Sequence, residues 1–315
     1  MLNMFKKKGE EKSSPRMPDV NTPKQTSYHS LDVPIPADFM STTSLPSDSK
    51  PITVDQIDFS KTAVPEYSGR YAVVLDNVLS QSECDQLIRM AEASVSASEQ
   101  GVKEGTGERD PWQPALVNIG AGWEVLQADY RNSDRIIWDQ EEITGRLWKR
   151  IKAGAPEVAK ELAEVEADLV VLGGKHWKEQ KWVFKALNER MRFLKYGKGQ
   201  FFRPHCDGAY EVPGLEPGKR TRTLFTLHLY LNDSVEAVKG ETARDGEEKP
   251  ELVGGSTPFL SNNEKRRVDV HPKAGRVLIF QHRGLLHSGD DVVEGTKYTV
   301  RSDILYDLVT TEKEE

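Results

Sequence analysis

Cysteine is scarce in this sequence, and long apolar runs are missing. Its 315 residues include two cysteines, Cys84 and Cys206, too few for the disulfide framework of a secreted domain. No stretch approaches the roughly 20 consecutive apolar residues that a membrane-spanning helix needs. The basic cluster Lys6–Lys8 precedes no apolar segment, unlike a secretory signal. These absences predict reduced thiols and a cytosolic or nuclear protein without a membrane segment.

A basic excess is missing as well. The chain has 43 basic and 50 acidic residues and a formal net charge of -7. A general nucleic-acid binder normally carries a basic face, so this balance disfavours nucleic acid as a partner. At this length the chain allows one large domain or two small ones.

Composition divides the chain into a tail and a domain. Residues 1–65 hold 8 of the 17 prolines, many serines and threonines, and no sustained periodicity. Such a segment cannot bury enough apolar surface to offset chain entropy, which predicts a disordered tail. Residues 66–310 form the predicted domain. Within it, residues 234–252 are charged and poor in apolar side chains, which indicates a flexible insert.

A strand and then helices open the predicted domain. The β-branched run at 71–75 predicts a strand, and Ser80 with Glu83 predicts the capping box of a helix. Cys84 begins the apolar face of that helix, so we expect a core residue and not a nucleophile. Helical spacing predicts two more helices, one marked by Ile143, Leu147, Trp148 and Ile151, the other by Val158, Leu162, Val165 and Leu169.

Short strands follow from about residue 182. Residues 223–231 alternate most clearly, with Phe225, Leu227, Leu229 and Leu231 on one face and Thr226, His228 and Tyr230 on the other. One face would pack on helices and the other would line a polar cavity. A last strand at 297–306 places Lys297, Thr299, Arg301 and Asp303 on one face. Helices followed by many short strands predict an α+β fold, a β-sandwich backed by helices.

Three side chains offer a metal donor set. In His205-Cys206-Asp207, alternation along a strand points His205 and Asp207 to the same side and Cys206 to the other. His287 can supply a second imidazole. Two imidazoles and one carboxylate form the facial triad that holds non-haem Fe(II) and leaves coordination positions open. His282, five residues before His287, is an alternative source of this imidazole.

Further motifs extend this pattern in a fixed order. They are Tyr196-Gly-x-Gly-Gln, His205-x-Asp207, Thr226 with Tyr230-Leu-Asn232, Gly254-Gly255-x-Thr257-x-Phe259, Gly275-Arg-Val-Leu-Ile-Phe280, and His287 with Lys297. In these motifs the segment 71–306 resembles the Fe(II)/2-oxoglutarate-dependent dioxygenase superfamily, and within it the prolyl 4-hydroxylase-like catalytic domain.

The resemblance implies a fold and a set of roles. The fold would be a double-stranded β-helix, or jelly roll, backed by the N-terminal helices. Fe(II), 2-oxoglutarate and O2 are implied, with ascorbate as a candidate additional cofactor. His205, Asp207 and His287 match the iron ligands and so the catalytic centre. Lys297 matches the cation that grips the distal carboxylate of 2-oxoglutarate, and Tyr196 and Tyr230 match residues that hydrogen-bond this cosubstrate.

The implied reaction is hydroxylation of a C–H bond, with release of succinate and CO2. The substrate would be a peptide or protein side chain of prolyl type, or a small metabolite. Two other classes stay open. A non-catalytic jelly-roll binding or scaffold module is disfavoured by the complete ligand set, and a nucleic-acid demethylase by the missing basic excess.

Arg301 is a second cation on the face that carries Lys297. It either pairs with Asp303 or another acid, or contacts the C1 carboxylate of the cosubstrate or an anionic group of the substrate. Whether Lys297 or Arg301 is the main partner of the cosubstrate is open from the residues alone.

Overall fold

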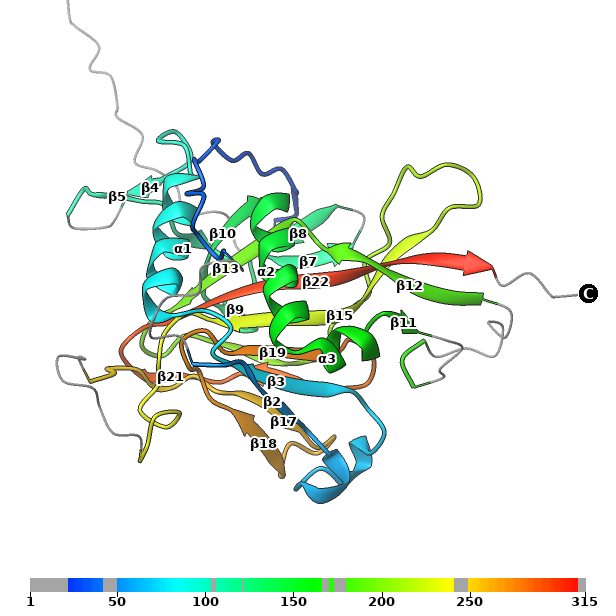
Figure 1. Cartoon of the computed structure of the whole chain (residues 1–315). Coiled ribbons are helices and arrows are strands. Elements are labelled where there is room, and N and C mark those ends of the chain that lie inside the picture. The colour runs from blue at the N-terminus through cyan, green and yellow to red at the C-terminus, as the bar shows by residue number, and fades with distance from the viewer. Residues whose placement is uncertain are drawn as a thin grey trace, which may run out of the picture.

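Strands are the main regular elements of the described chain, with few helices among them (Figure 1). The computed structural model describes residues 22–41, 50–102, 106–120, 122–165, 170–172, 180–240 and 249–310. Within these residues the largest sheet has ten strands, joined in antiparallel pairs. Eight of them lie in the order β2 (Thr53–Gln56), β3 (Ala72–Asp76), β19 (Val277–Gln281), β15 (Thr221–Tyr230), β22 (Lys297–Thr310), β13 (Arg190–Tyr196), β10 (Asp134–Asp139) and β6 (Gln113–Pro114). On a side branch, β12 (Gln180–Leu187) pairs with β22, and β11 (Glu164–Val165) pairs with β12.

A second sheet of five strands carries the histidines predicted to bind metal. Its order is β18 (Arg267–Val270), β17 (Thr257–Leu260), β20 (His287–Gly289), β14 (Phe201–His205) and β9 (Arg131–Asn132). Smaller sheets are formed by β1 (Lys24–Gln25), β8 (Trp123–Val125) and β7 (Val117–Gly120), by β16 (Val253–Gly254) and β21 (Val292–Glu294), and by β4 (Gly101–Val102) and β5 (Arg109–Asp110).

The predicted alternation along β15 determines which side chains enter which core cluster. Phe225, Leu227 and Leu229 belong to a large buried cluster that also contains residues of the helices. Tyr230 belongs to a second cluster, together with Leu278 of β19 and with Phe259 and Val270 of β17 and β18. Successive residues of a strand point to opposite faces. The ten-stranded sheet therefore packs against helices on one face and toward the five-stranded sheet on the other.

The helix layer consists of α1 (Gln81–Ala93), α2 (Glu141–Gly154) and the short α3 (Pro156–Glu161), and Figure 1 shows α1 and α2 beside the strands of the large sheet. The capping box is confirmed, because Ser80 accepts from the amide of Glu83 and Glu83 accepts from the amide of Ser80. The buried Arg150 of α2 then bonds Glu83 at 2.8 Å and ties α2 to α1. Cys84 is a core residue, as predicted. Among the described residues, no helix is both long and apolar enough to cross a membrane.

The prediction of a structureless tail over 1–65 is wrong for residues 22–41 and 50–65. The strand β2 pairs with β3, β1 pairs with β8, and a 3-10 turn, η1 (Phe59–Lys61), precedes a second, η2 (Pro65–Tyr67). Phe39, Met40 and Phe59 are almost fully buried. Isolated apolar residues anchor this segment to a core formed by the rest of the chain, which needs no local periodicity. Residues 1–21 and 42–49 lie outside the described residues.

Two other expectations need correction. The helix predicted to include Val158 and Val165 ends at Glu161, and Val165 lies in strand β11 instead. Leu162 follows the last helical residue and Val165 lies in the strand, so their buried side chains fall at helical spacing only by coincidence. Leu169 lies outside the described residues.

The predicted insert at 234–252 has ordered ends. Ser234 and Leu252 are buried and form an isolated β-bridge, whereas residues 241–248 are not described.

Gly275 joins the helix layer to the sheet. Its φ is +73°, its amide donates to Tyr230, and its carbonyl accepts from Val78. A Cβ at this position would lie 1.9 Å from the carbonyl oxygen of Leu79. We expect Gly275→Ala to lower the free energy of unfolding by about 3 kcal/mol. Gly199→Ala is the matched control, because Gly199 has a φ of +76° with open space around it, so only about 1 kcal/mol is expected. Urea unfolding measures both values, and equal losses would contradict the expected clash.

Candidate metal centre

The pairing of β14 with β20 brings the predicted donor side chains together. His205 lies directly opposite His287 in this antiparallel pair, and Asp207 follows the end of β14. The three ligand atoms all lie within 4.8 Å of one another. The Nε2 atoms of His205 and His287 lie 3.7 and 3.8 Å from the carboxylate oxygens of Asp207. His282 is not part of this group; its Nε2 lies 3.4 Å from Asp303.

Backbone carbonyls orient both imidazoles. The Nδ1 of His205 lies 2.8 Å from the carbonyl oxygen of Arg203, and the Nδ1 of His287 lies 3.0 Å from that of Leu285. A ring that donates from Nδ1 keeps the lone pair of Nε2 free, and this is how metal-binding histidines are commonly held. Burial lowers the pKa of His205 to about 3 and also lowers the pKa of His287. Both rings are therefore neutral, as metal ligands must be.

Asp207 is held as a carboxylate in a buried position. Burial by itself would raise the pKa of Asp207, but the adjacent Arg301 and the histidines outweigh it and hold that pKa well below its usual range. The Nη1 of Arg301 lies 3.1 Å from one carboxylate oxygen, and the hydroxyl of Thr226 donates to the other. A carboxylate offers about four lone-pair sites, so acceptor capacity for a metal remains.

Arg301 extends this contact into a buried charge network. Its Nη2 lies 3.2 Å from Asp303, which also binds Arg192 at 3.0 Å. Burial would raise the pKa of Asp303, but Arg301, His282 and Arg192 lower it far more. Of the two alternatives stated for Arg301, pairing with acids is what the structure contains. Arg301 is therefore tied to Asp207 and Asp303 at once.

Lys297 is the contrasting cation on the same strand. It is 1% exposed, and its Nζ lies 5.3 and 5.6 Å from the ring centroids of Tyr196 and Tyr230. No hydrogen bond or ion pair with another described residue reaches its ammonium group. The neighbouring Thr299 Oγ1 and His228 Nε2 are also buried without hydrogen-bond partners among the described residues. The predicted cosubstrate residues therefore lie around a buried amine that has no charge partner among the described residues.

Phe202 is a site residue that the sequence did not reveal. Its ring stacks on His205 with centroids 3.8 Å apart and planes at 28°. A register shift in β14 between Phe202 and His205 allows this stacking. Strict alternation would have placed the two side chains on opposite faces. A bulge leaves no signature in the hydrophobic pattern, so no sequence signal could have identified this contact.

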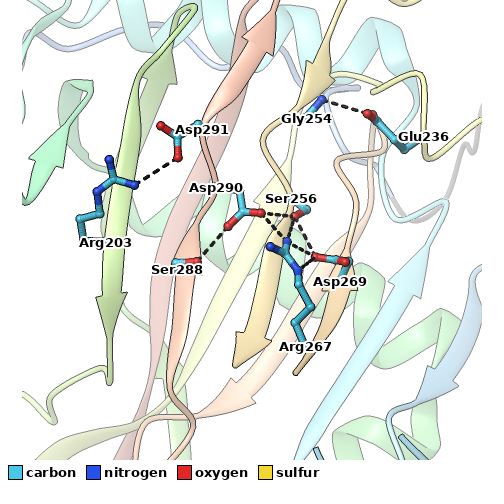
Figure 2. Close-up of polar contacts among 9 residues, drawn as sticks. All are labelled: Arg203, Glu236, Gly254, Ser256, Arg267, Asp269, Ser288, Asp290 and Asp291. Carbon is cyan, nitrogen blue, oxygen red and sulfur yellow. Dashed lines mark hydrogen bonds and ion pairs between the residues drawn. The ribbon is translucent and has the colours of Figure 1, made fainter. Parts of the chain in front are cut away.

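Polar contacts hold strands of the five-stranded sheet together close to His287 of the candidate metal centre (Figure 2). Arg267 bonds Ser256, Asp269 and Asp290, and Asp290 also accepts from Ser288, the residue after His287. These contacts fix β20 relative to β17 and β18.

A second link and a small pocket lie close by. Arg203, two residues before His205, pairs with Asp291 at 3.1 Å (Figure 2). A pocket of about 240 Å³ lies here, with Phe202, Leu260, Gly289 and Asp290 among its lining residues. Ion pairs and hydrogen bonds thus connect the strands that carry both histidines on the side of this pocket.

Comparison with protein families gives one match. Residues 191–302 match the family model described as the 2OG-Fe(II) oxygenase superfamily. This segment contains all three donor residues and Lys297. No curated protein matches the sequence.

Solved structures give distant similarities. The viral collagen prolyl hydroxylase of Paramecium Bursaria Chlorella virus-1, in a 2OG complex, is 19% identical, with 75% of this chain and 97% of that chain covered and a TM-score of 0.39. A Pseudomonas putida prolyl-4-hydroxylase is 14% identical, with 78% and 95% covered and a TM-score of 0.41. A Trichoplax adhaerens prolyl hydroxylase, in complex with a hypoxia inducible factor peptide fragment, is 14% identical, with 78% and 88% covered and a TM-score of 0.43.

Proposed function

We propose that this chain, which belongs to the 2OG-Fe(II) oxygenase superfamily as its motifs predicted, binds Fe(II) through His205, Asp207 and His287 and oxidises an organic substrate with 2-oxoglutarate and O2. The observation that carries the proposal is a complete donor set within 4.8 Å, together with a buried Lys297 that has no ion pair among the described residues. The proposed reaction hydroxylates a C–H bond of a prolyl-type peptide side chain or of a small metabolite, and it releases succinate and CO2.

The donor chemistry fits Fe(II). Two neutral imidazoles and one carboxylate are the ligands that non-haem Fe(II) takes in a facial arrangement, with positions left open for other ligands. Bound iron would supply the one-electron and O2 chemistry, which protein side chains cannot provide. The chain supplies orientation, because Arg203 and Leu285 fix the two imidazoles and Thr226 and Arg301 fix the carboxylate.

The residues around Lys297 suit the 2-oxoglutarate dianion. An unpaired buried ammonium group is costly, and a carboxylate from a ligand would neutralise it. The rings of Tyr196 and Tyr230 lie 5.3 and 5.6 Å from its Nζ, and Thr299 offers a hydroxyl without a hydrogen-bond partner among the described residues. We assign Lys297 as the main partner of the distal carboxylate, with Tyr196 and Tyr230 as its neighbours.

Arg301 receives a different role in this proposal. Its guanidinium group already contacts Asp207 and Asp303, so it orients the iron-binding carboxylate. A contact between Arg301 and the C1 carboxylate of the cosubstrate stays a hypothesis.

The remaining family expectations stay proposals. We propose that the two large sheets are the layers of a double-stranded β-helix, backed by α1 and α2, and that the catalytic domain spans 66–310 with β2 added at its edge. Ascorbate is proposed only as an additional reductant.

Lys297 predicts a pH dependence of cosubstrate binding. Burial lowers its pKa from 10.5 to about 7, with a small opposing effect of Asp290. The dianion needs the protonated amine, so above that pKa binding must take up a proton. We expect 2-oxoglutarate affinity to be constant below about pH 7 and to fall up to about tenfold per pH unit above it. Calorimetric titration of the Mn(II)-loaded protein measures this. Lys297→Arg, charged throughout, is the control and should give a much flatter profile; a wild-type profile equally flat would refute the prediction.

The proposed function is tested by succinate formation. We expect Fe(II)-dependent conversion of 2-oxoglutarate to succinate, stimulated by members of peptide or metabolite pools and abolished by a chelator. The competing scaffold hypothesis predicts no succinate under any of these conditions. Asp291→Ala is the matched control for variants of the centre, because Asp291 is exposed and pairs only with Arg203 among the described residues.

A further inference from the structure

Arg131 carries a buried positive charge for which the described chain provides no carboxylate. The residue is 9% exposed, its Nε has no hydrogen-bond partner, and no ion pair among the described residues includes it. Burial lowers the pKa of Arg131 to about 10, so the guanidinium group remains charged at neutral pH. Its main polar neighbour is Tyr196, a phenol that is uncharged at that pH and whose pKa is raised further by burial.

The position of Arg131 connects it to the metal centre. Strand β9 pairs with β14 so that Arg131 lies opposite Phe202. The guanidinium carbon lies 4.7 Å from the centroid of the Phe202 ring, and that ring stacks on His205. Arg301, which binds Asp207, is among the charges that act on Arg131. Arg131 is therefore linked to the donor residues through the ring of Phe202.

The neighbouring cations are already neutralised, and Arg131 is not. Arg135 binds Glu124 at 3.0 Å, Arg192 binds Asp303, and Arg301 binds Asp207. In this part of the described chain, Lys297 and Arg131 are the two cations left without a carboxylate. Bound Fe(II) would add two positive charges and a 2-oxoglutarate dianion would add two negative ones. The charged groups named here, with iron and cosubstrate added, would then still sum to an excess of positive charge.

We propose that Arg131 binds a carboxylate of the substrate, so that the enzyme selects acidic substrates. This inference rests on the proposed function, whose substrate class it specifies. A planar guanidinium group can bind a carboxylate through two parallel hydrogen bonds, and its position beyond Phe202 would hold the acid at a fixed distance from the metal. The carboxylate belongs either to a small organic acid or to an acidic side chain of a peptide.

The test uses two pools of matched compounds. One contains small carboxylic acids and their primary amides, and the other contains end-blocked peptides that differ only in Glu or Gln beside a proline. Binding is measured on the full chain loaded with Mn(II) and 2-oxoglutarate, and stimulation of succinate formation on the Fe(II) enzyme. We expect acids in one pool to bind about tenfold or more tighter than their amides. Arg131→Met should remove that preference and Arg131→Lys should keep part of it.

The readouts separate this role from others. The KM for 2-oxoglutarate should stay within about twofold in Arg131→Met, so that the change is confined to the added substrate. A rise in that KM would assign Arg131 to the cosubstrate and overturn the inference, as would the absence of any preference for acids in both pools. If Arg131→Met fails to fold, as judged by its melting curve, Arg131→Lys decides. Absence of all Fe(II)-dependent succinate in the wild type would instead refute the proposed function itself.

Discussion

Asp207→Ala should reduce metal affinity by at least about 100-fold, more than the loss of a supporting hydrogen bond typically costs, and should bring succinate formation to background. The substitution removes the only anionic donor of the set. It also leaves Arg301 with Asp303 as its remaining carboxylate partner. Anaerobic Fe(II) titration measures the affinity, and a coupled succinate assay measures turnover.

Two controls make the expected result specific. Asp291→Ala removes an exposed acid close to the centre and should change metal affinity by less than about twofold, since exposed ion pairs contribute little. Circular dichroism establishes whether Asp207→Ala keeps its fold. Full activity of a folded Asp207→Ala protein would show that the metal assignment is wrong.

Lys297→Met should raise the KM for 2-oxoglutarate by about 10- to 100-fold, because a charge-assisted hydrogen bond is worth about 1.5–3 kcal/mol. Methionine keeps much of the packing against Tyr196 and Tyr230, so the substitution chiefly removes the positive charge. Metal affinity should hold within about twofold, because no hydrogen bond or ion pair among the described residues links Lys297 to the donor side chains. Initial rates at varied 2-oxoglutarate give the KM.

The control for Lys297→Met is Lys181→Met, which removes a partly exposed lysine paired with Glu164 and should leave the KM unchanged. An unchanged KM in Lys297→Met would move the cosubstrate assignment to Arg301. Arg301→Leu would then be expected to raise the KM, whereas under the present assignment it should chiefly weaken metal binding through Asp207.

Features that depend only on residues close in sequence could be predicted. The capping box at Ser80 and Glu83 and the alternating faces of 223–231 depend on neighbours a few residues away. His205 and Asp207 are close in sequence and lie close together in the structure, although β14 ends at His205 and strand alternation does not extend to Asp207. Their approach to His287 is different, because it depends on the register of β14 against β20. The motif order implied this contact through family resemblance, and no residue spacing could establish it.

Charge pairing could not be predicted either. Arg131 lies in a strand of two residues, too short for any periodicity, and its burial is created by β14 and Phe202. The pairing of Arg301 with both Asp207 and Asp303 likewise depends on two strands and a loop. Sequence placed Arg301 and Asp303 on one face, but it could not show that the carboxylate of Asp207 would lie against them.

The strand β2 also determines where this chain can be shortened. A protein beginning at residue 66, as composition alone would suggest, would lack the partner of β3 and the buried ring of Phe59. The backbone donors and acceptors of β3 would then form an open sheet edge, which invites pairing between molecules. Such a truncated protein should aggregate at concentrations where one beginning near residue 50 stays monodisperse, and light scattering of the two would show it.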